Sequence, residues 1–264
     1  MTMLNKISRW LGAFLVIGAL LLTGCTSPET TSSSTPTNLA TNTPPTAESS
    51  STVMTNPTNA PQIAGMPRLE GKATVVMVVK GAPITIEVDG TDAPITAGNF
   101  VDLVKQGVYN GSMFHRVVRE PQPFVVQGGD PQSKDPNFPP AMLGTGSFVD
   151  PITKQPRYIP LEIKPEGSEQ PIYSQVFRDA GVTAKPKLKH TRGAVAMARS
   201  ANPDSASAQF YFALADLDFL DGNYAVFGYV TEGMDTVDKV QQGDRIQSAE
   251  VTKGLENLKV AGKS

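Results

Sequence analysis

The segment from Thr26 to about Gln62 carries hardly a large apolar residue, and this limits where the chain can fold. Ser, Thr, Pro, Asn and Ala dominate its composition. Such a segment cannot bury enough apolar surface to offset the entropy that is lost on ordering. We therefore expect residues 26–66 to form a disordered tether and residues 67–264 to form one domain.

The N-terminus has the pattern of a targeting signal. A short positive region precedes an apolar run at residues 10–22, which is too short for a comfortable membrane span. The run ends in Leu-Thr-Gly-Cys at residues 22–25, which resembles a bacterial lipobox, in which the cysteine thiol receives a diacylglycerol. We expect residues 1–25 to form a signal peptide, with Cys25 lipidated and the protein anchored on the extracytoplasmic, periplasmic side of a bacterial membrane. An uncleaved membrane anchor is the alternative.

Composition argues against several classes of protein. The formal net charge is -2 over 264 residues, so the basic excess that nucleic acid binding requires is missing. The two histidines, His115 and His190, lie far apart in the sequence, and the single cysteine is not near either of them. We therefore expect no metal site and no cofactor. No serine stands in the sequence context of a hydrolase nucleophile.

The expected domain begins with a predicted hairpin and a helix. An apolar run at Val75–Val79 and alternating apolar residues at Ile84–Val88 flank a turn at residues 80–83. Thr96 is a plausible N-cap for a helix that ends at Gly107. The order is therefore strand, strand, helix.

The rest of the domain reads as short strands with one more helix. Strands are predicted at 124–127, 193–197, 209–213 and 225–230, and a helix at 234–240. Many strands with two helices suggest a closed barrel plugged by helices. The pattern alone does not choose a barrel over a sandwich.

Four sequence blocks, in a fixed order, carry a family resemblance. They are Phe-His-Arg-Val-Val at 114–118 with Phe-Val-Val-Gln-Gly-Gly-Asp at 124–130, Gly-Ala-Val-Ala-Met-Ala-Arg at 193–199, Ser-Ala-Gln-Phe-Tyr-Phe at 207–212, and Phe-Leu-Asp-Gly at 219–222 with Val-Phe-Gly at 226–228. From about Ala73 to Val251 the chain resembles the cyclophilins, a family of peptidyl-prolyl cis-trans isomerases. The resemblance implies a mainly β fold, an eight-stranded antiparallel closed barrel capped by two α-helices, here with long loop insertions.

The resemblance also implies roles for individual residues. Arg116 takes the place of the catalytic arginine, with Gln127 bonding the substrate backbone and Phe124 lining the proline pocket. Tyr211 stands where the family commonly has Phe, and Tyr224 where animal members have a pocket histidine. The full set of residues that the resemblance assigns to substrate binding, in the pocket or along the groove, is Val125, Ala198, Arg199, Gln209, Tyr211, Phe219, Leu220 and Tyr224.

Two departures from the family pattern affect the expected site. Between Asp130 and Lys189 the chain has about sixty residues where many bacterial relatives have a short link, and loops of that length are usually functional or disordered. Our hypothesis is that this insertion rims the substrate groove; a packed surface elaboration is the alternative. Phe219 takes the position of a tryptophan whose indole N–H binds cyclosporin in other members. We therefore predict weak cyclosporin binding.

The expected function is isomerisation of X-Pro bonds during extracytoplasmic protein folding. We expect a monomer whose partners are proline-containing polypeptides and, through the lipid anchor, a membrane. One alternative is a cyclophilin-fold module that holds unfolded or proline-rich segments as a chaperone, without turnover. Another is a structural envelope lipoprotein.

Overall fold

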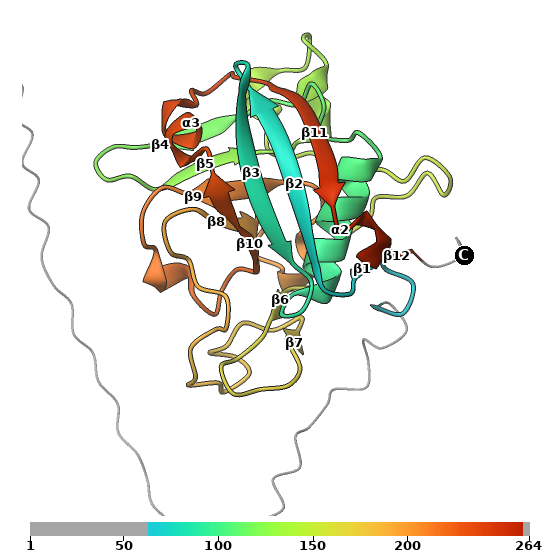
Figure 1. The fold of residues 1–264 in the computed structure, drawn as a ribbon, viewed down its shortest axis with the longest axis vertical. Helices are drawn as coiled ribbons and strands as arrows, with labels where there is room; N and C mark the ends of the chain where they lie inside the picture. Colours follow the sequence, from blue (N-terminus) through green and yellow to red (C-terminus); the bar gives the residue numbers. More distant parts are fainter. Residues whose placement is uncertain (1–62, 261–264) are drawn as a thin grey trace, which may run out of the picture. The chain divides into compact units, whose positions relative to one another are not determined.

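The computed structural model describes residues 63–260, so the expected signal peptide, Cys25 and most of the expected tether lie outside the described residues. The chain divides into two units, Met1–Val53 and Met54–Ser264, of which only the second contains described residues. That unit is built around a curled antiparallel sheet (Figure 1). No helix within residues 63–260 is both long enough and apolar enough to cross a membrane.

Eight strands form the main sheet, in the order β11, β2, β3, β10, β8, β9, β5, β4. Their bounds are β2 Lys72–Val79, β3 Ala82–Asp89, β4 Arg116–Val118, β5 Val125–Gly128, β8 Ala194–Met197, β9 Phe210–Ala213, β10 Val226–Glu232 and β11 Ile246–Lys253. Two small antiparallel sheets accompany it, β1 (Arg68–Leu69) with β12 (Leu258–Lys259) and β6 (Glu162–Ile163) with β7 (Ile172–Tyr173). The predicted strands are thus confirmed to within a few residues.

The main sheet closes only partly, which corrects the expectation of a closed barrel. Among the described strands, the edge strands β11 and β4 are not neighbours in the strand order. Residues 111–114, which precede β4, meet residues 243–246 at the start of β11 through one isolated bridge, between Met113 and Arg245, and four backbone hydrogen bonds of 2.7 to 2.9 Å. Within the described part of the chain, these contacts do not extend into a ladder between β4 and β11. The sheet is therefore a curled half-barrel.

The first hairpin has a tighter turn than the sequence predicts. Val79 pairs with Ala82, so the turn has two residues and Pro83 already belongs to β3. Lys80 and Gly81 both have positive φ, 54° and 77°. This geometry suits a two-residue turn that matches the twist of the flanking strands.

Helix α2 (Pro94–Lys105) begins two residues before the predicted N-cap, so the assignment of Thr96 as N-cap is wrong. The cap position is Ala93, whose side chain cannot accept a hydrogen bond. Instead, the buried carboxylate of Glu162 accepts bonds from the N–H groups of Ile95 (3.1 Å) and Thr96 (2.7 Å) and from the Thr96 hydroxyl (2.7 Å). A side chain that lies far along the chain, in the stretch 159–163, therefore satisfies the helix terminus.

The core lies between the sheet and α2. It contains six buried aromatic rings whose centroids lie 4.8 to 6.3 Å from their neighbours, namely Phe100, Tyr109, Phe114, Phe210, Phe212 and Phe227. The predicted second helix is present as α3 (Met234–Lys239), which buries Val237 in the core, and Val240, directly after the helix, is buried there too. Since side chains alternate along a strand, Tyr211 of β9 points to the opposite face from its two phenylalanine neighbours.

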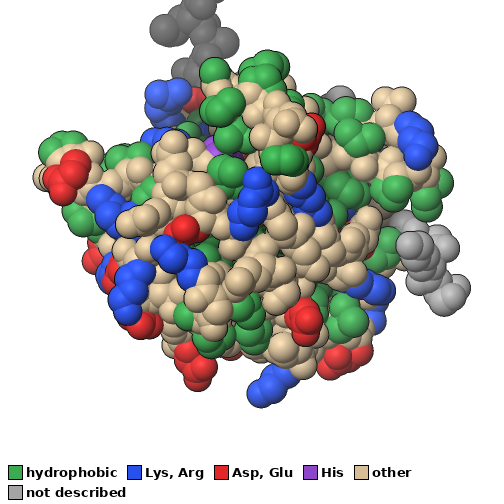
Figure 2. All heavy atoms as spheres, turned by 90° about the horizontal axis from the view of Figure 1, so that it is seen from above, with side chains coloured by type: hydrophobic (Ala, Val, Ile, Leu, Met, Phe, Trp, Pro, Cys, Tyr) green, Lys and Arg blue, Asp and Glu red, His purple; other side chains and the backbone are tan. Residues whose placement is uncertain are grey.

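The surface carries charges of both signs. On the face drawn in Figure 2, Lys and Arg side chains are interspersed with Asp and Glu, and hydrophobic patches lie between them. No strongly basic region gathers among the described residues on this face. This agrees with the small net charge of the sequence.

Candidate active site

A line of polar side chains begins at the hairpin of β4 and β5. Arg116 and Gln127 are register partners, and the Arg116 Nη1 donates to the Gln127 Oε1 at 3.3 Å. The Gln127 Nε2 donates to the Gln209 Oε1 at 3.2 Å. The Gln209 Nε2 in turn donates to the carbonyls of Gly144 and Gly146 at 2.9 and 2.8 Å. The orientation of the arginine partner is thus fixed by backbone of the insertion.

A pocket of about 240 Å³, lined by both apolar and polar side chains, opens beside this line. Every residue that lines it is one that the resemblance had assigned to the site. They are Arg116, Phe124, Val125, Gln127, Ala198, Arg199, Tyr211, Leu220 and Tyr224. The structure therefore gathers residues from four separate stretches of the chain around one cavity.

Phe219, predicted to line this pocket, lies outside its lining and is 68% exposed. It belongs to a short 3-10 helix, η4 (Asp218–Leu220), in which successive side chains point about 120° apart. Leu220 therefore points into the pocket while Phe219 points outward. The Phe219 ring stacks on that of Phe124, with centroids 6.0 Å apart and an interplanar angle of 17°. Phe219 therefore contacts a lining residue of the pocket without lining the pocket itself.

A larger groove of about 570 Å³ adjoins the pocket and shares Gln127, Ala198 and Arg199 with it. Gln209 lies in this groove, where the sequence had placed it. The insertion contributes Gly144–Ser147 and Tyr158 to the lining. The two cavities thus form one continuous depression.

The rest of the insertion packs elsewhere. Within the described chain, residues 164–186 line neither the pocket nor the groove. Phe177 instead packs with Leu161, Ile163 and Ala225 in a small separate core, and its N–H donates to the Gly222 carbonyl at 2.9 Å. The rim hypothesis therefore applies to residues 144–158, while 164–186 fit the alternative of a packed surface elaboration.

Arg199 closes one side of the pocket through its side chain. Its guanidinium donates to the Asn223 carbonyl at 3.0 and 2.6 Å and to the Ser200 carbonyl at 2.8 Å. The same group lies over the Tyr224 ring, 4.7 Å from its centroid. Arg199 therefore ties the loop that carries Tyr224 to the end of β8.

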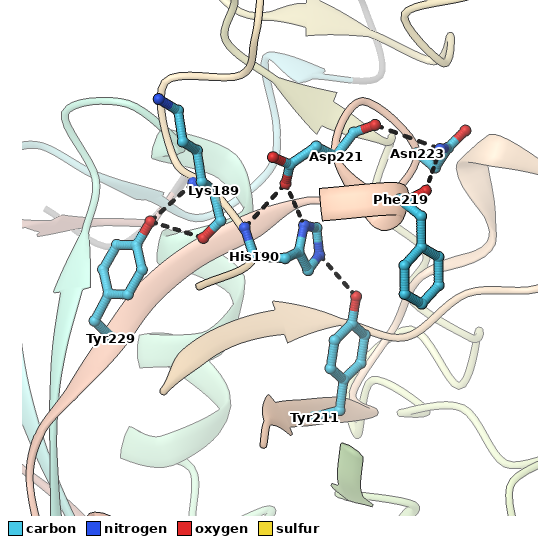
Figure 3. Close-up of polar contacts among 7 residues, drawn as sticks. All are labelled: Lys189, His190, Tyr211, Phe219, Asp221, Asn223 and Tyr229. Carbon is cyan, nitrogen blue, oxygen red and sulfur yellow. Dashed lines mark hydrogen bonds and ion pairs between the residues drawn. The ribbon is translucent and has the colours of Figure 1, made fainter. Parts of the chain in front are cut away.

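His190 is the residue near the site that the sequence did not point to. Its Nδ1 lies 2.8 Å from the Asp221 Oδ1 and its Nε2 lies 3.0 Å from the Tyr211 hydroxyl, as Figure 3 shows. Motif spacing gives no sign of these contacts. One signal was available: a tyrosine at a buried pocket position normally finds a partner for its hydroxyl.

The basic side chains that line the pocket are those of Arg116 and Arg199. Burial lowers the pKa of His190, although the carboxylate of Asp221 opposes this shift. Burial also lowers the pKa of His115 and raises the pKa of the Tyr211 hydroxyl. Both histidines and the tyrosine are therefore neutral near pH 7. Among residues 63–260, no three His, Cys, Asp or Glu side chains gather in a way that could hold a metal ion.

The chain has clear relatives among known proteins. A Synechocystis protein, provisionally named a thylakoid lumen peptidyl-prolyl cis-trans isomerase, is 41% identical over 208 residues, which cover 75% of this chain and 51% of the relative. A chloroplastic peptidyl-prolyl cis-trans isomerase of Arabidopsis thaliana is 38% identical over 220 residues, which cover 75% of this chain and 47% of the relative. The chain thus spans about half the length of these curated relatives.

A solved structure shows the same fold. A cyclophilin type peptidyl-prolyl cis-trans isomerase of Cryptosporidium parvum aligns with a TM-score of 0.50 at 21% identity, covering 69% of this chain and 98% of that one. The family model described as cyclophilin type peptidyl-prolyl cis-trans isomerase/CLD matches residues 74–260, which is well over half of the chain. The chain therefore belongs to the cyclophilin-type peptidyl-prolyl cis-trans isomerase family.

Proposed function

We propose that this protein accelerates cis-trans rotation about X-Pro bonds in polypeptides. One observation carries the proposal: the Arg116 guanidinium lines a pocket of about 240 Å³ that also presents apolar and aromatic side chains, and it is paired with Gln127 and lies over the Phe124 ring. A permanent cation at the edge of a cavity that can hold a proline ring is the arrangement that this reaction needs.

The reaction asks for little chemistry. Rotation about a peptide bond meets a barrier of roughly 18–20 kcal/mol because the nitrogen lone pair is delocalised into the carbonyl. In the twisted state this lone pair becomes localised and can accept a hydrogen bond. A guanidinium donates while it stays charged at any physiological pH. Arg116 can therefore stabilise the twisted state, while Gln127 bonds the neighbouring backbone and the pocket holds the proline ring.

The adjoining groove supports a polypeptide substrate over a small molecule. It is open, is lined largely by small polar side chains and glycines, and runs directly into the pocket through shared residues. A cyclophilin of Cryptosporidium parvum with the same fold was crystallised in the presence of the dipeptide Ala-Pro. In this chain, residues before and after the proline could lie along the groove.

The proposal is tested by NMR exchange spectroscopy on an X-Pro peptide with the full chain. We expect strong acceleration of exchange, lost on the order of 10²-fold in Arg116→Ala. Arg178→Ala is the matched control, because that side chain is 88% exposed and pairs with its neighbour Asp179. Binding of the peptide without acceleration would instead support a chaperone or peptide-binding module.

We further propose that the protein works as a monomer on the extracytoplasmic face of a bacterial membrane, held by acylated Cys25 through the tether at 26–66. The lipobox-like sequence supports this, as does the thylakoid lumen in the name of the Synechocystis relative. Labelled fatty acid should enter the wild type and not Cys25→Ser. Light scattering in detergent should give the mass of one chain.

A further inference from the structure

A hydrogen-bonded line connects Asp221, His190 and Tyr211 (Figure 3), and Tyr211 lines the pocket described above. It runs from the carboxylate of Asp221 to the imidazole of His190 at 2.8 Å, and from there to the hydroxyl of Tyr211 at 3.0 Å. The His190 residue is fully buried and does not line the pocket. Whatever His190 does to a bound peptide, it therefore does through its neighbours.

The donors and acceptors in this line can be arranged in only one way while His190 is neutral. A carboxylate only accepts, so the imidazole Nδ1 carries the proton and its N–H donates a hydrogen bond to Asp221. The Nε2 is then an acceptor, and the Tyr211 hydroxyl must donate to it. The same Asp221 oxygen also accepts the His190 backbone N–H at 2.9 Å. The imidazole is thus held in one tautomer and one orientation.

The two ends of the line belong to different walls of the pocket. Tyr211 lies on β9 and its ring lines the cavity, where it meets the Tyr224 ring edge-on at 6.2 Å. Asp221 directly follows Leu220, which lines the cavity from η4. The distance between the β9 wall and the η4 wall therefore depends on the group that joins Tyr211 to Asp221.

We propose that His190 is a positioning residue for the isomerase function proposed above, on which this inference rests: by linking Asp221 to the Tyr211 hydroxyl, it sets the width of the proline pocket. It acts on how tightly a prolyl peptide binds and leaves the rotation of the bound peptide to Arg116. The reason is that the Tyr211 ring lines the pocket in which the proline ring is proposed to lie. Arg116 and Gln127 are the groups proposed above to act on the bond that rotates, and they bond to each other rather than to His190.

The test is a double-mutant cycle on peptide affinity, read by NMR titration of the full chain with an Ala-Pro-containing peptide. Tyr211→Phe removes the hydroxyl, while His190→Asn keeps an amide that can reach Asp221 and is too short to reach Tyr211. Each change should raise Kd roughly three- to tenfold, with the exchange rate at saturation little changed. The double variant should match the single ones. If the Kd of the double variant rose by the product of the two single fold-changes, the proposal would be overturned, because His190 would then act independently of Tyr211.

A conservative variant and a spectroscopic signature separate positioning from a merely structural role. The longer amide of His190→Gln can accept from Tyr211, so its Kd should lie closer to wild type than that of His190→Asn. Imidazole ¹⁵N shifts should show a protonated Nδ1 and an unprotonated Nε2 in wild type, with the Nε2 signal moving in Tyr211→Phe and on peptide addition. A protonated Nε2 in the wild type, or an Nε2 signal that does not move when peptide is added, would contradict the proposal. This measurement needs only the wild type, so it remains available if a variant fails to fold.

The readouts distinguish this inference from the proposed function. Affinity is measured apart from acceleration. If the wild type binds the peptide without accelerating its rotation, the isomerase assignment is wrong, but the double-mutant cycle on affinity still tests the role of His190. A normal acceleration with unchanged Kd in His190→Asn and Tyr211→Phe would leave the isomerase assignment standing and remove the positioning role.

Discussion

The guanidinium carbon of Arg116 lies 5.4 Å from the centroid of the Phe124 ring, at the mouth of the pocket. A contact of this kind at an exposed site stabilises by roughly 0.5–1 kcal/mol, which is too little to hold a long side chain in place alone. The hydrogen bond to Gln127 and the Phe219 ring behind Phe124 add to it. The position of the cation is therefore the joint result of several weak contacts.

The outward position of Phe219 leads to a prediction about cyclosporin. Phe219 has no N–H to donate, so wild type should bind the drug weakly, and nanomolar inhibition would be evidence against this. Phe219→Trp places an indole N–H at the exposed mouth of the pocket and should tighten binding roughly tenfold, on the scale of one hydrogen bond. Phe219→Leu is the control, and isothermal titration calorimetry gives the affinities.

The carboxylate of Glu162 should contribute strongly to stability. It is buried and accepts hydrogen bonds from the start of α2 and from the Tyr173 hydroxyl at 3.0 Å. Glu162→Ala leaves these donors buried and unpaired and should lower the free energy of unfolding by about 2–4 kcal/mol. Urea denaturation measures this. The exposed Glu169→Ala should change it by less than about 0.5 kcal/mol, and equal effects would rule out the capping role.

Stability should fall as the solution is acidified from pH 7.5 to 5.5. Burial lowers the pKa of His115 and of His190 below the usual 6.5, so the unfolded chain binds more protons in this window. The stabilisation is complete above pH 6.5 and is lost as the pH falls through the folded pKa values. Burial raises the pKa of Glu162, which acts in the opposite direction.

Variants separate these contributions to the pH dependence. The slope of unfolding free energy against pH should become flatter in His190→Gln and in His115→Gln, measured by urea denaturation at each pH. A steeper slope in either variant would mean that the histidine concerned is not held neutral by burial.

The rim of the groove should contribute to the binding of long substrates and not to the binding of short peptides. Tyr158 lines the groove and is 46% exposed, with its hydroxyl 3.2 Å from that of Ser147. Tyr158→Ala should weaken binding of an unfolded proline-containing protein by about 1 kcal/mol, roughly fivefold in Kd, and leave a tetrapeptide unaffected. Ile152→Ala, 78% exposed in the same insertion but outside the groove lining, is the control. Equal weakening for both ligands would contradict a rim role.

Sequence periodicity predicted the strands and the helix whose formation depends on residues close together in the sequence. The apolar run at Val75–Val79 and the alternation at Ile84–Val88 predict the first two strands, and the spacing at 234–240 predicts α3. The residues of the pocket could be named only through the resemblance, because periodicity cannot show that Arg116 and Tyr224 meet around one cavity.

The predictions that failed depended on distant partners. Thr96 reads as an N-cap until Glu162, 66 positions later, is seen to accept the hydrogen bonds of the helix terminus. The sheet is a half-barrel because an isolated bridge, and no ladder, joins its two edges within the described residues, and no sequence motif predicts this. Phe219 points outward because a three-residue 3-10 helix rotates it away. The contacts of His190 could not be predicted from the sequence, because its partners Asp221 and Tyr211 come close to it only in the folded chain.

The most direct test of the account separates binding from rotation in Arg116→Ala. NMR line-shape fitting over a titration with an X-Pro peptide yields the Kd and the exchange rate of the bound peptide from one data set. Because Arg116 is proposed to stabilise the twisted bond, Kd should change by less than about threefold while bound-state exchange slows on the order of 10²-fold. Bound-state exchange as fast as in wild type would contradict the central role of Arg116, as would a loss confined to affinity.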